Sequence, residues 1–202
     1  MTKNRLLLII EVMGAITLTL TAVWFWTGRT KEGSKLEVLS QAGISFRDAV
    51  GQKAPDFTLD DTEGNEVSLG SLSSRDVVLF FTEGFMCNPC FTQLVALSAD
   101  ERLNNNETVS FSVVIGDQEK LHKILSNLPP LLPLKVLFDT DGNVSRLYDT
   151  VNLTSPMHKG LDNGHTYFVI DRQGVIRFAF DDPYMGVRNY LLATEIEKLK
   201  TR

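Results

Sequence analysis

The residues best suited to chemistry in this 202-residue sequence are two cysteines spaced as Cys-x-x-Cys, Cys87 and Cys90. They are the only cysteines of the chain. That count excludes a scaffold of several disulfides and a zinc module built on four thiolates. A thiol pair at this spacing can interconvert between dithiol and disulfide, since one sulfur attacks a substrate and the other resolves the product. We therefore predict thiol–disulfide redox chemistry.

The pair lies where the chain is expected to pass from a buried strand into a helix. Residues 77–82 form a continuous apolar run of the kind found in central strands, and helical periodicity follows from Pro89. Free N–H groups and the positive end of the dipole stabilise a thiolate at a helix N-terminus. We expect Cys87 to be the exposed nucleophile and Cys90 the resolving thiol. Pro89 suits the first turn because no N–H is needed there.

Other interpretations of the cysteine pair remain open at this stage. The two thiols could form a plain structural disulfide, lie buried without a chemical role, or supply half of a metal site. A structural zinc site needs four protein ligands. The other candidates for the missing ligands are His122, His158 and His165.

The elements that must position the pair alternate in type along the chain. Expected strands lie at residues 57–59, 66–69, 77–82, 109–115, 135–138, 166–170 and 175–180, and expected helices at 89–103, 117–125 and 189–200. The first two strands and the last two flank turn sequences and should form hairpins. In the first helix, Leu94, Val95 and Leu97 are expected to face inward. This order predicts an α/β domain whose mixed central sheet is flanked by helices.

The first 50 residues differ in kind from the rest. Leu6 to Trp26 is an apolar run that, at about 1.5 Å per residue, can cross the roughly 30 Å hydrocarbon core of a bilayer. It is longer than the apolar region of a cleaved signal peptide. We expect a tail over residues 1–5, an N-terminal transmembrane helix over 6–26, a linker over 27–50 and a domain over 51–202. The chain would then be a single-pass protein of the cell membrane with its domain outside the cytoplasm.

Composition limits the possible partners. Hydrophobic residues make up 43% of the sequence, as in ordinary globular proteins. The chain has 20 Lys and Arg against 25 Asp and Glu, a net charge of −5, and no dense basic cluster. Nucleic acid is therefore not an expected partner. The expected partners are protein thiols or disulfides, or an upstream membrane thiol reductant.

Five segments in order resemble the redoxin family, the alkyl hydroperoxide reductase C and thiol-specific antioxidant branch of the thioredoxin-like superfamily. They are Gly51 to Leu59 (GQKAPDFTL), Gly64 to Leu69 (GNEVSL), Val77 to Phe81 (VVLFF), Cys87 to Cys90 (CNPC) and Thr166 to Gly174 (TYFVIDRQG). The resemblance covers about residues 50–200. It implies a thioredoxin-like fold and a thiol oxidoreductase that works through its cysteines.

Two positions depart from the peroxiredoxin pattern. That branch carries a threonine three residues before its reactive cysteine, where this chain has Gly84, and an arginine in the region where His165 stands. The Cys-x-x-Cys itself resembles membrane-tethered thioredoxins that reduce or rearrange disulfides. We therefore expect a membrane-tethered thiol–disulfide oxidoreductase, with a peroxiredoxin-like thiol peroxidase as the alternative.

His165 is the third candidate site residue, because it opens a strand that passes beside the cysteine pair in the implied fold. It could tune the acidity of Cys87, act as a hydrogen-bonded turn residue, or complete a metal site with Cys87 and Cys90. The metal site resembles the copper chaperones of cytochrome oxidase assembly, which space their cysteines by three residues instead of two. The main interpretation needs no cofactor, and the alternative needs copper.

Overall fold

The protein is described from a computed structural model, in which residues 42–84, 87–116, 119, 123 and 134–201 are described. The predicted transmembrane helix, the tail before it and most of the linker lie outside these residues and stay predictions, as does most of the expected helix at 117–125. Among the residues that the structure describes, no helix is both long and apolar enough to cross a membrane.

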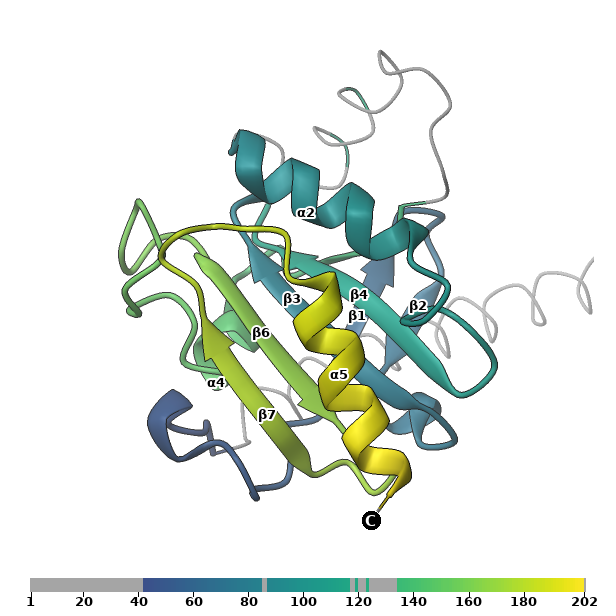
Figure 1. The fold of residues 1–202 in the computed structure, drawn as a ribbon. Coiled ribbons are helices and arrows are strands. Elements are labelled where there is room, and N and C mark those ends of the chain that lie inside the picture. The colour runs from purple at the N-terminus through teal and green to yellow at the C-terminus, as the bar shows by residue number, and fades with distance from the viewer. Residues whose placement is uncertain (1–41, 85–86, 117–118, 120–122, 124–133, 202) are drawn as a thin grey trace, which may run out of the picture. The chain divides into compact units, whose positions relative to one another are not determined.

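A mixed sheet forms the centre of the domain (Figure 1). Within the described residues it has seven strands in the order β2-β1-β5-β4-β3-β6-β7. Strand β4 pairs in parallel with β3 and β5, and the remaining neighbours are antiparallel. The strands are β1 (Thr58–Asp61), β2 (Glu66–Ser68), β3 (Asp76–Thr82), β4 (Thr108–Val114), β5 (Val136–Phe138), β6 (His165–Ile170) and β7 (Ile176–Asp181).

Two helices, α2 (Asn88–Ala99) and α5 (Asn189–Lys200), pack on one face of this sheet, where Figure 1 shows them in front of the strands. Alternate strand residues point toward them, because successive side chains of a strand face opposite sides. The buried cluster on this side contains residues from both helices and from the central strands: Val78, Phe80, Leu94, Leu97, Tyr167, Val169, Leu192 and Ile196. The two helices thus share one core with β3 and β6.

The opposite face of the sheet is covered by aromatic side chains. Tyr148, at the end of the short helix α4 (Asn143–Leu147), lies with its ring centroid 5.1 Å from Phe81 and 5.2 Å from Phe168. Phe46 of the 3-10 helix η1 (Phe46–Asp48) adds a ring 5.8 Å from that of Phe168. A second 3-10 helix, η2 (Gly70–Leu72), precedes β3. The mixed α/β sheet flanked by helices is therefore confirmed.

The helix that carries the cysteines is shorter than predicted, and it buries Leu94 and Leu97 as predicted. It ends at Ala99, four residues before the predicted end, because Asp100 has extended dihedral angles (φ −83°, ψ 108°). The side-chain amide of Asn104 folds back and donates to the carbonyls of Leu97 and Asp100, which also accept the backbone N–H groups of Asp100 and Leu103. Gln93 is fully buried, whereas Val95 is only partly so.

The last residues of the predicted linker are packed against the domain. The N–H of Ile44 donates to the carbonyl of Leu147 at 2.8 Å, and the N–H of Phe46 donates to the Asp149 carboxylate at 3.1 Å. The side chain of Ala49 is fully buried. The folded domain therefore begins before residue 51.

Loss of the packing between α2 and the sheet should lower the free energy of unfolding of the domain. Leu94 is fully buried between α2 and the strands, so Leu94→Ala is expected to lower the free energy of unfolding by about 2–5 kcal/mol. Leu161→Ala is the matched control, because this leucine is 78% exposed, and should cost less than about 0.5 kcal/mol. Urea unfolding followed by circular dichroism measures both. Equal losses in the two variants would contradict the packing described here.

Candidate active site

Cys87 and Cys90 lie at the N-terminus of α2, directly beyond the end of β3. They form a disulfide with Cα atoms 5.2 Å apart. Cys87 is the N-cap residue of α2, and the N–H of Cys90 lies 3.4 Å from its Sγ atom. Pro89 occupies the first turn, as predicted. The helix thus directs a backbone donor at the sulfur of Cys87, which is the arrangement that stabilises a thiolate in the reduced form.

Both cysteines are buried in this disulfide form, with Cys87 3% and Cys90 0% exposed. The expectation of an exposed Cys87 is therefore wrong for this state. The loop between β7 and α5 contributes to this burial, since the Sδ atom of Met185 lies 4.0 Å from the Sγ atom of Cys87. Met185 itself is only partly buried, so it lies between the sulfur and solvent.

The carboxylate of Asp182 holds this loop in place. Asp182 is fully buried, and it accepts the backbone N–H groups of Tyr184 at 3.1 Å and Gly186 at 2.9 Å. Arg188 adds two charge-assisted hydrogen bonds, at 2.6 and 3.0 Å. Burial alone would raise the pKa of Asp182, but the hydrogen bonds from Arg188 and the two backbone groups outweigh it and lower this pKa. The loop therefore wraps around a stable anion.

Gln93 connects the same loop to the helix of the cysteines. Its side-chain oxygen accepts the N–H of Arg188 at 2.7 Å, and its side-chain nitrogen donates to Asn189 at 2.9 Å. Asn189 in turn donates to the carbonyl of Ala96 at 2.8 Å. The start of α5 and the loop before it are thus fixed to α2, so that Met185 and Cys87 keep their relative positions.

His165 opens β6 and is fully buried. Its Nε2 atom lies 3.2 Å from the carbonyl oxygen of Gly186, and since a carbonyl only accepts, Nε2 carries the proton. Among the residues that the structure describes, the Nδ1 atom finds no hydrogen-bond partner. Desolvation by burial lowers the pKa of His165 to about 4. The ring is therefore a neutral imidazole at neutral pH, with an unpaired acceptor at Nδ1.

The contacts of the described residues connect His165 to the cysteines through the loop. The ring bonds to Gly186, and the adjacent Met185 contacts Cys87. Within the residues that the structure describes, no group of three or more His, Cys, Asp or Glu side chains could hold a metal ion. A disulfide offers no thiolate to a metal, so the copper alternative with Cys87, Cys90 and His165 stays a prediction about the dithiol form.

Gly84 explains one departure from the peroxiredoxin pattern. Its φ angle is +73°, a conformation that residues with a side chain rarely adopt. A Cβ atom at this position would lie 2.9 Å from the side chain of Val114. A threonine three residues before Cys87 is therefore incompatible with this backbone.

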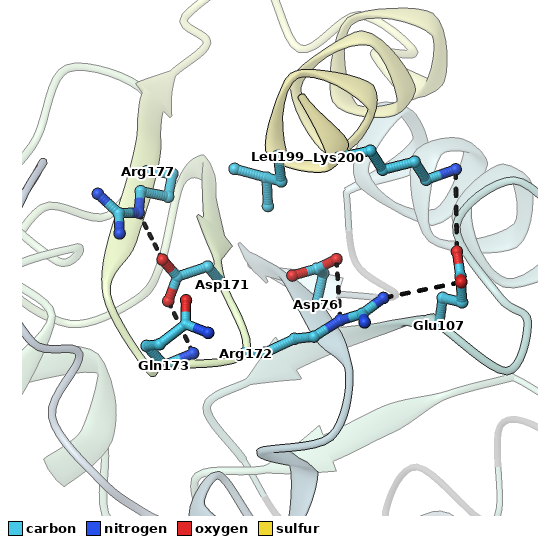
Figure 2. Close-up of a pocket in the computed structure, with 8 residues that line it drawn as sticks. All are labelled: Asp76, Glu107, Asp171, Arg172, Gln173, Arg177, Leu199 and Lys200. Atoms are coloured by element: carbon cyan, nitrogen blue, oxygen red, sulfur yellow. Dashed lines mark hydrogen bonds and ion pairs between the residues drawn. The ribbon is translucent and has the colours of Figure 1, made fainter. Parts of the chain in front are cut away.

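A cavity of about 660 Å³ lies at the other end of β3, away from the cysteines, and is lined mainly by charged residues (Figure 2). Its side chains pair with one another: Arg177 with Asp171 at 2.5 Å, Arg172 with Asp76 at 3.6 Å and with Glu107 at 3.9 Å, and Lys200 with Glu107 at 4.0 Å. Neither cysteine nor histidine is among the described residues that line it. The redox site and this cavity are thus separated by the length of the strand.

The sequence did not single out the residues that shape the loop. Asp182 precedes a proline, which indicates a turn, and nothing in the sequence next to Met185 indicates a contact with a cysteine 98 residues away. The position of Gln93 in the sequence does indicate a role. It follows Cys90 by three residues and therefore shares its helix face, where a polar residue among apolar ones indicates a buried hydrogen bond.

A mixed sheet flanked by helices, with a cysteine pair at the N-terminus of the helix after a central strand, defines a thioredoxin-like thiol-redox domain. The chain belongs to the AhpC/TSA family, whose profile matches residues 50–179. It is 26% identical over 144 residues to chloroplastic peroxiredoxin Q of Suaeda salsa, a match that covers 71% of this chain and 65% of the relative. It is 28% identical over 134 residues to peroxiredoxin Bcp of Escherichia coli, covering 65% and 85%.

The fold agrees with solved structures of the same class. The crystal structure of reduced 2-Cys peroxiredoxin from Plasmodium vivax matches with a TM-score of 0.64 and 16% identity, over 76% of this chain and 82% of that one. The thioredoxin-like fold is therefore confirmed. Family membership and the relatives also confirm the expectation of an enzyme that acts as a thiol-dependent oxidoreductase. They do not test the membrane anchor.

The buried neutral His165 should make stability depend on pH. Its pKa is about 4 in the folded protein and about 6.5 in an unfolded chain. Below about pH 6.5 the unfolded state therefore takes up a proton that the folded state does not, and stability falls by up to about 1.4 kcal/mol per pH unit until about pH 4. The His165→Asn variant should lose this part of the slope.

Urea unfolding at several values of pH between 7.5 and 4 measures the difference between the two proteins. His158→Asn is the control, because His158 is 68% exposed and its removal leaves the buried ring in place. Parallel curves for the wild-type protein and His165→Asn would contradict the lowered pKa of His165, because they would mean that the ring binds protons equally in the folded and unfolded states.

Proposed function

We propose that this domain reduces a small hydroperoxide with Cys87 and ends each turnover by forming the Cys87–Cys90 disulfide. The observation that carries the proposal is this disulfide at a helix N-terminus in a chain of the AhpC/TSA family. Both relatives compared above are named peroxiredoxins. The burial of both cysteines adds support, because a small peroxide reaches an enclosed sulfur more easily than a folded protein does.

The reaction has two steps on the two sulfurs. The Cys87 thiolate attacks one oxygen of a hydroperoxide ROOH, the O–O bond breaks, and the alkoxide leaves as ROH after taking a proton from solvent. Cys87 is thereby oxidised to a sulfenic acid. The Cys90 thiol then attacks the sulfenic sulfur, which forms the disulfide and releases water. Thiols of a reductant restore the dithiol by exchange and become a disulfide themselves.

The roles of the two cysteines follow from the helix end. Cys87 receives the N–H of Cys90 at 3.4 Å and is the N-cap residue, so its thiolate is the more stabilised of the two. Cys90 is fully buried one turn into the helix and is bonded to Cys87. This assigns attack to Cys87 and resolution to Cys90, with Pro89 stiffening the turn between them.

His165 acts in this scheme as a positioning residue. In its neutral form the only ring proton is on Nε2 and is donated to Gly186. The ring therefore has no further proton for a leaving alkoxide, and it supports the loop that places Met185 against Cys87.

Direct exchange with protein disulfides is the second candidate. It is favoured by the Cys-x-x-Cys spacing and by Gly84, whose backbone cannot hold the threonine of the peroxiredoxin pattern. In this version the predicted anchor at residues 6–26 tethers the domain to the cell membrane, outside the cytoplasm. Its partners there are protein thiols or an upstream membrane thiol reductant.

Peroxide consumption by the reduced protein tests the first proposal. With dithiothreitol as reductant, the wild type is expected to consume hydrogen peroxide catalytically, and Cys87→Ser should abolish this consumption because no attacking sulfur remains. Cys90→Ser should stop at a sulfenic acid on Cys87, because the resolving thiol is missing. Dimedone labelling followed by peptide mass spectrometry detects that acid.

Insulin reduction under the same conditions separates the two candidates. A protein that reduces insulin disulfides through Cys87 but consumes peroxide no faster than Cys87→Ser acts by exchange, and the peroxidase proposal is then overturned. Loss of both activities in Cys87→Ser, with peroxide the faster substrate, supports the peroxidase.

A further inference from the structure

We propose that Met185 is the specificity-determining residue of the Cys87 site, limiting access to the sulfur by its size. The choice of a hydroperoxide as substrate rests on the proposed function. The limit that Met185 sets on access applies to any reagent that approaches Cys87. Small hydroperoxides pass beside the methionine side chain, and hydroperoxides with bulky substituents are excluded.

The position of Met185 is the first observation. Its Sδ atom lies 4.0 Å from the Sγ atom of Cys87, which is van der Waals contact between two sulfurs. Cys87 is only 3% exposed, although it lies at a helix end near the surface. The neighbours of Met185 in the loop point outward, with Tyr184 88% and Val187 52% exposed. Met185 therefore lies over the reactive sulfur, while the side chains of Tyr184 and Val187 face solvent.

The backbone of Met185 is the second observation. Its φ angle is +51°, in the left-handed region that residues other than glycine seldom adopt. Such a conformation persists only where the surroundings enforce it, and it is concentrated at functional sites. Here the enforcement comes from Asp182, whose carboxylate accepts the N–H groups on both sides of Met185, those of Tyr184 and Gly186.

The loop does not depend on the oxidation state of the cysteines. Its contacts run from Asp182 to backbone N–H groups and Arg188, and from Arg188 to Gln93 on α2. None of these groups is a sulfur. Reduction of the disulfide therefore leaves the anchors of the loop intact, and Met185 covers Cys87 in the dithiol form that meets the substrate.

Three substitutions of Met185 distinguish the effect of side-chain size from the effects of the sulfur atom and of backbone strain. Met185→Ala removes most of the side chain, Met185→Leu keeps about the same volume without sulfur, and Met185→Gly removes the side chain and relieves the left-handed backbone. Tyr184→Ala is the matched control, because it truncates an exposed neighbour in the same loop.

The first measurement does not use peroxide. The dithiol protein is alkylated with iodoacetamide or with the bulkier fluorescein maleimide, and the rate at Cys87 is followed by peptide mass spectrometry. In Met185→Ala and Met185→Gly the ratio of the bulky to the small reagent's rate should rise at least about tenfold. Met185→Leu and Tyr184→Ala should keep the wild-type ratio. An unchanged ratio in both the alanine and the glycine variants overturns the proposal, as does a Met185→Leu variant that behaves like Met185→Ala.

The second measurement compares kcat/KM for cumene hydroperoxide with that for hydrogen peroxide. The same two truncations should shift this ratio toward cumene hydroperoxide by a similar factor. If the wild type consumes no peroxide but the alkylation ratios change as expected, the proposed function fails and the role of Met185 stands. If the wild type is an active peroxidase and neither ratio moves, the role of Met185 fails alone.

Discussion

The buried carboxylate of Asp182 organises the end of the domain that carries the redox site. A charge removed from water is tolerated only when its lone pairs are occupied by well-placed donors. Asp182 meets this condition with two backbone N–H groups of its own loop and with the guanidinium of Arg188. Because half of these donors belong to the backbone, the requirement dictates the path of the chain, which curls around the carboxylate.

That path has consequences on both sides of the loop. One side presents the carbonyl of Gly186 to the buried ring of His165, and the other presents Met185 to Cys87. Gln93 then fixes this unit to α2, through Arg188 and Asn189. Two helices that pack on a sheet through apolar side chains alone could slide along each other. The buried side-chain amide of Gln93 on α2 forms hydrogen bonds with Arg188 and Asn189 at the start of α5, and these bonds fix one position of the two helices relative to each other.

Much of the fold could be predicted from the sequence, because it follows from patterns of apolar residues. The run at residues 77–82 became a fully buried strand, and the terminal helix has the predicted ends at residues 189 and 200. Both hairpins also formed where turn residues separate short β-rich segments. In each case the signal is local, since period and turn chemistry act over a few residues.

The site could be predicted only in part, because its remaining features depend on pairs of residues far apart in the chain. The helix-end position of Cys87 and Cys90 follows from local sequence, and the start of β6 at His165 does too. Cys87 is in contact with Met185, which is 98 residues away. Apolar periodicity shows which face of an element is buried, but it does not show which buried polar groups meet.

The same geometry decides what can stabilise a thiolate on Cys87. Burial of the sulfur opposes ionisation, so a compensating interaction is needed. Of the two basic side chains next to the loop, Arg188 is neutralised by Asp182, and His165 carries no charge at neutral pH, because burial lowers its pKa to about 4. The interaction that stabilises the thiolate against burial therefore comes from the N-terminus of α2, where the N–H of Cys90 faces the Cys87 sulfur. Since these donors stabilise a thiolate more than a disulfide, they favour the dithiol form and make the disulfide the more readily reduced.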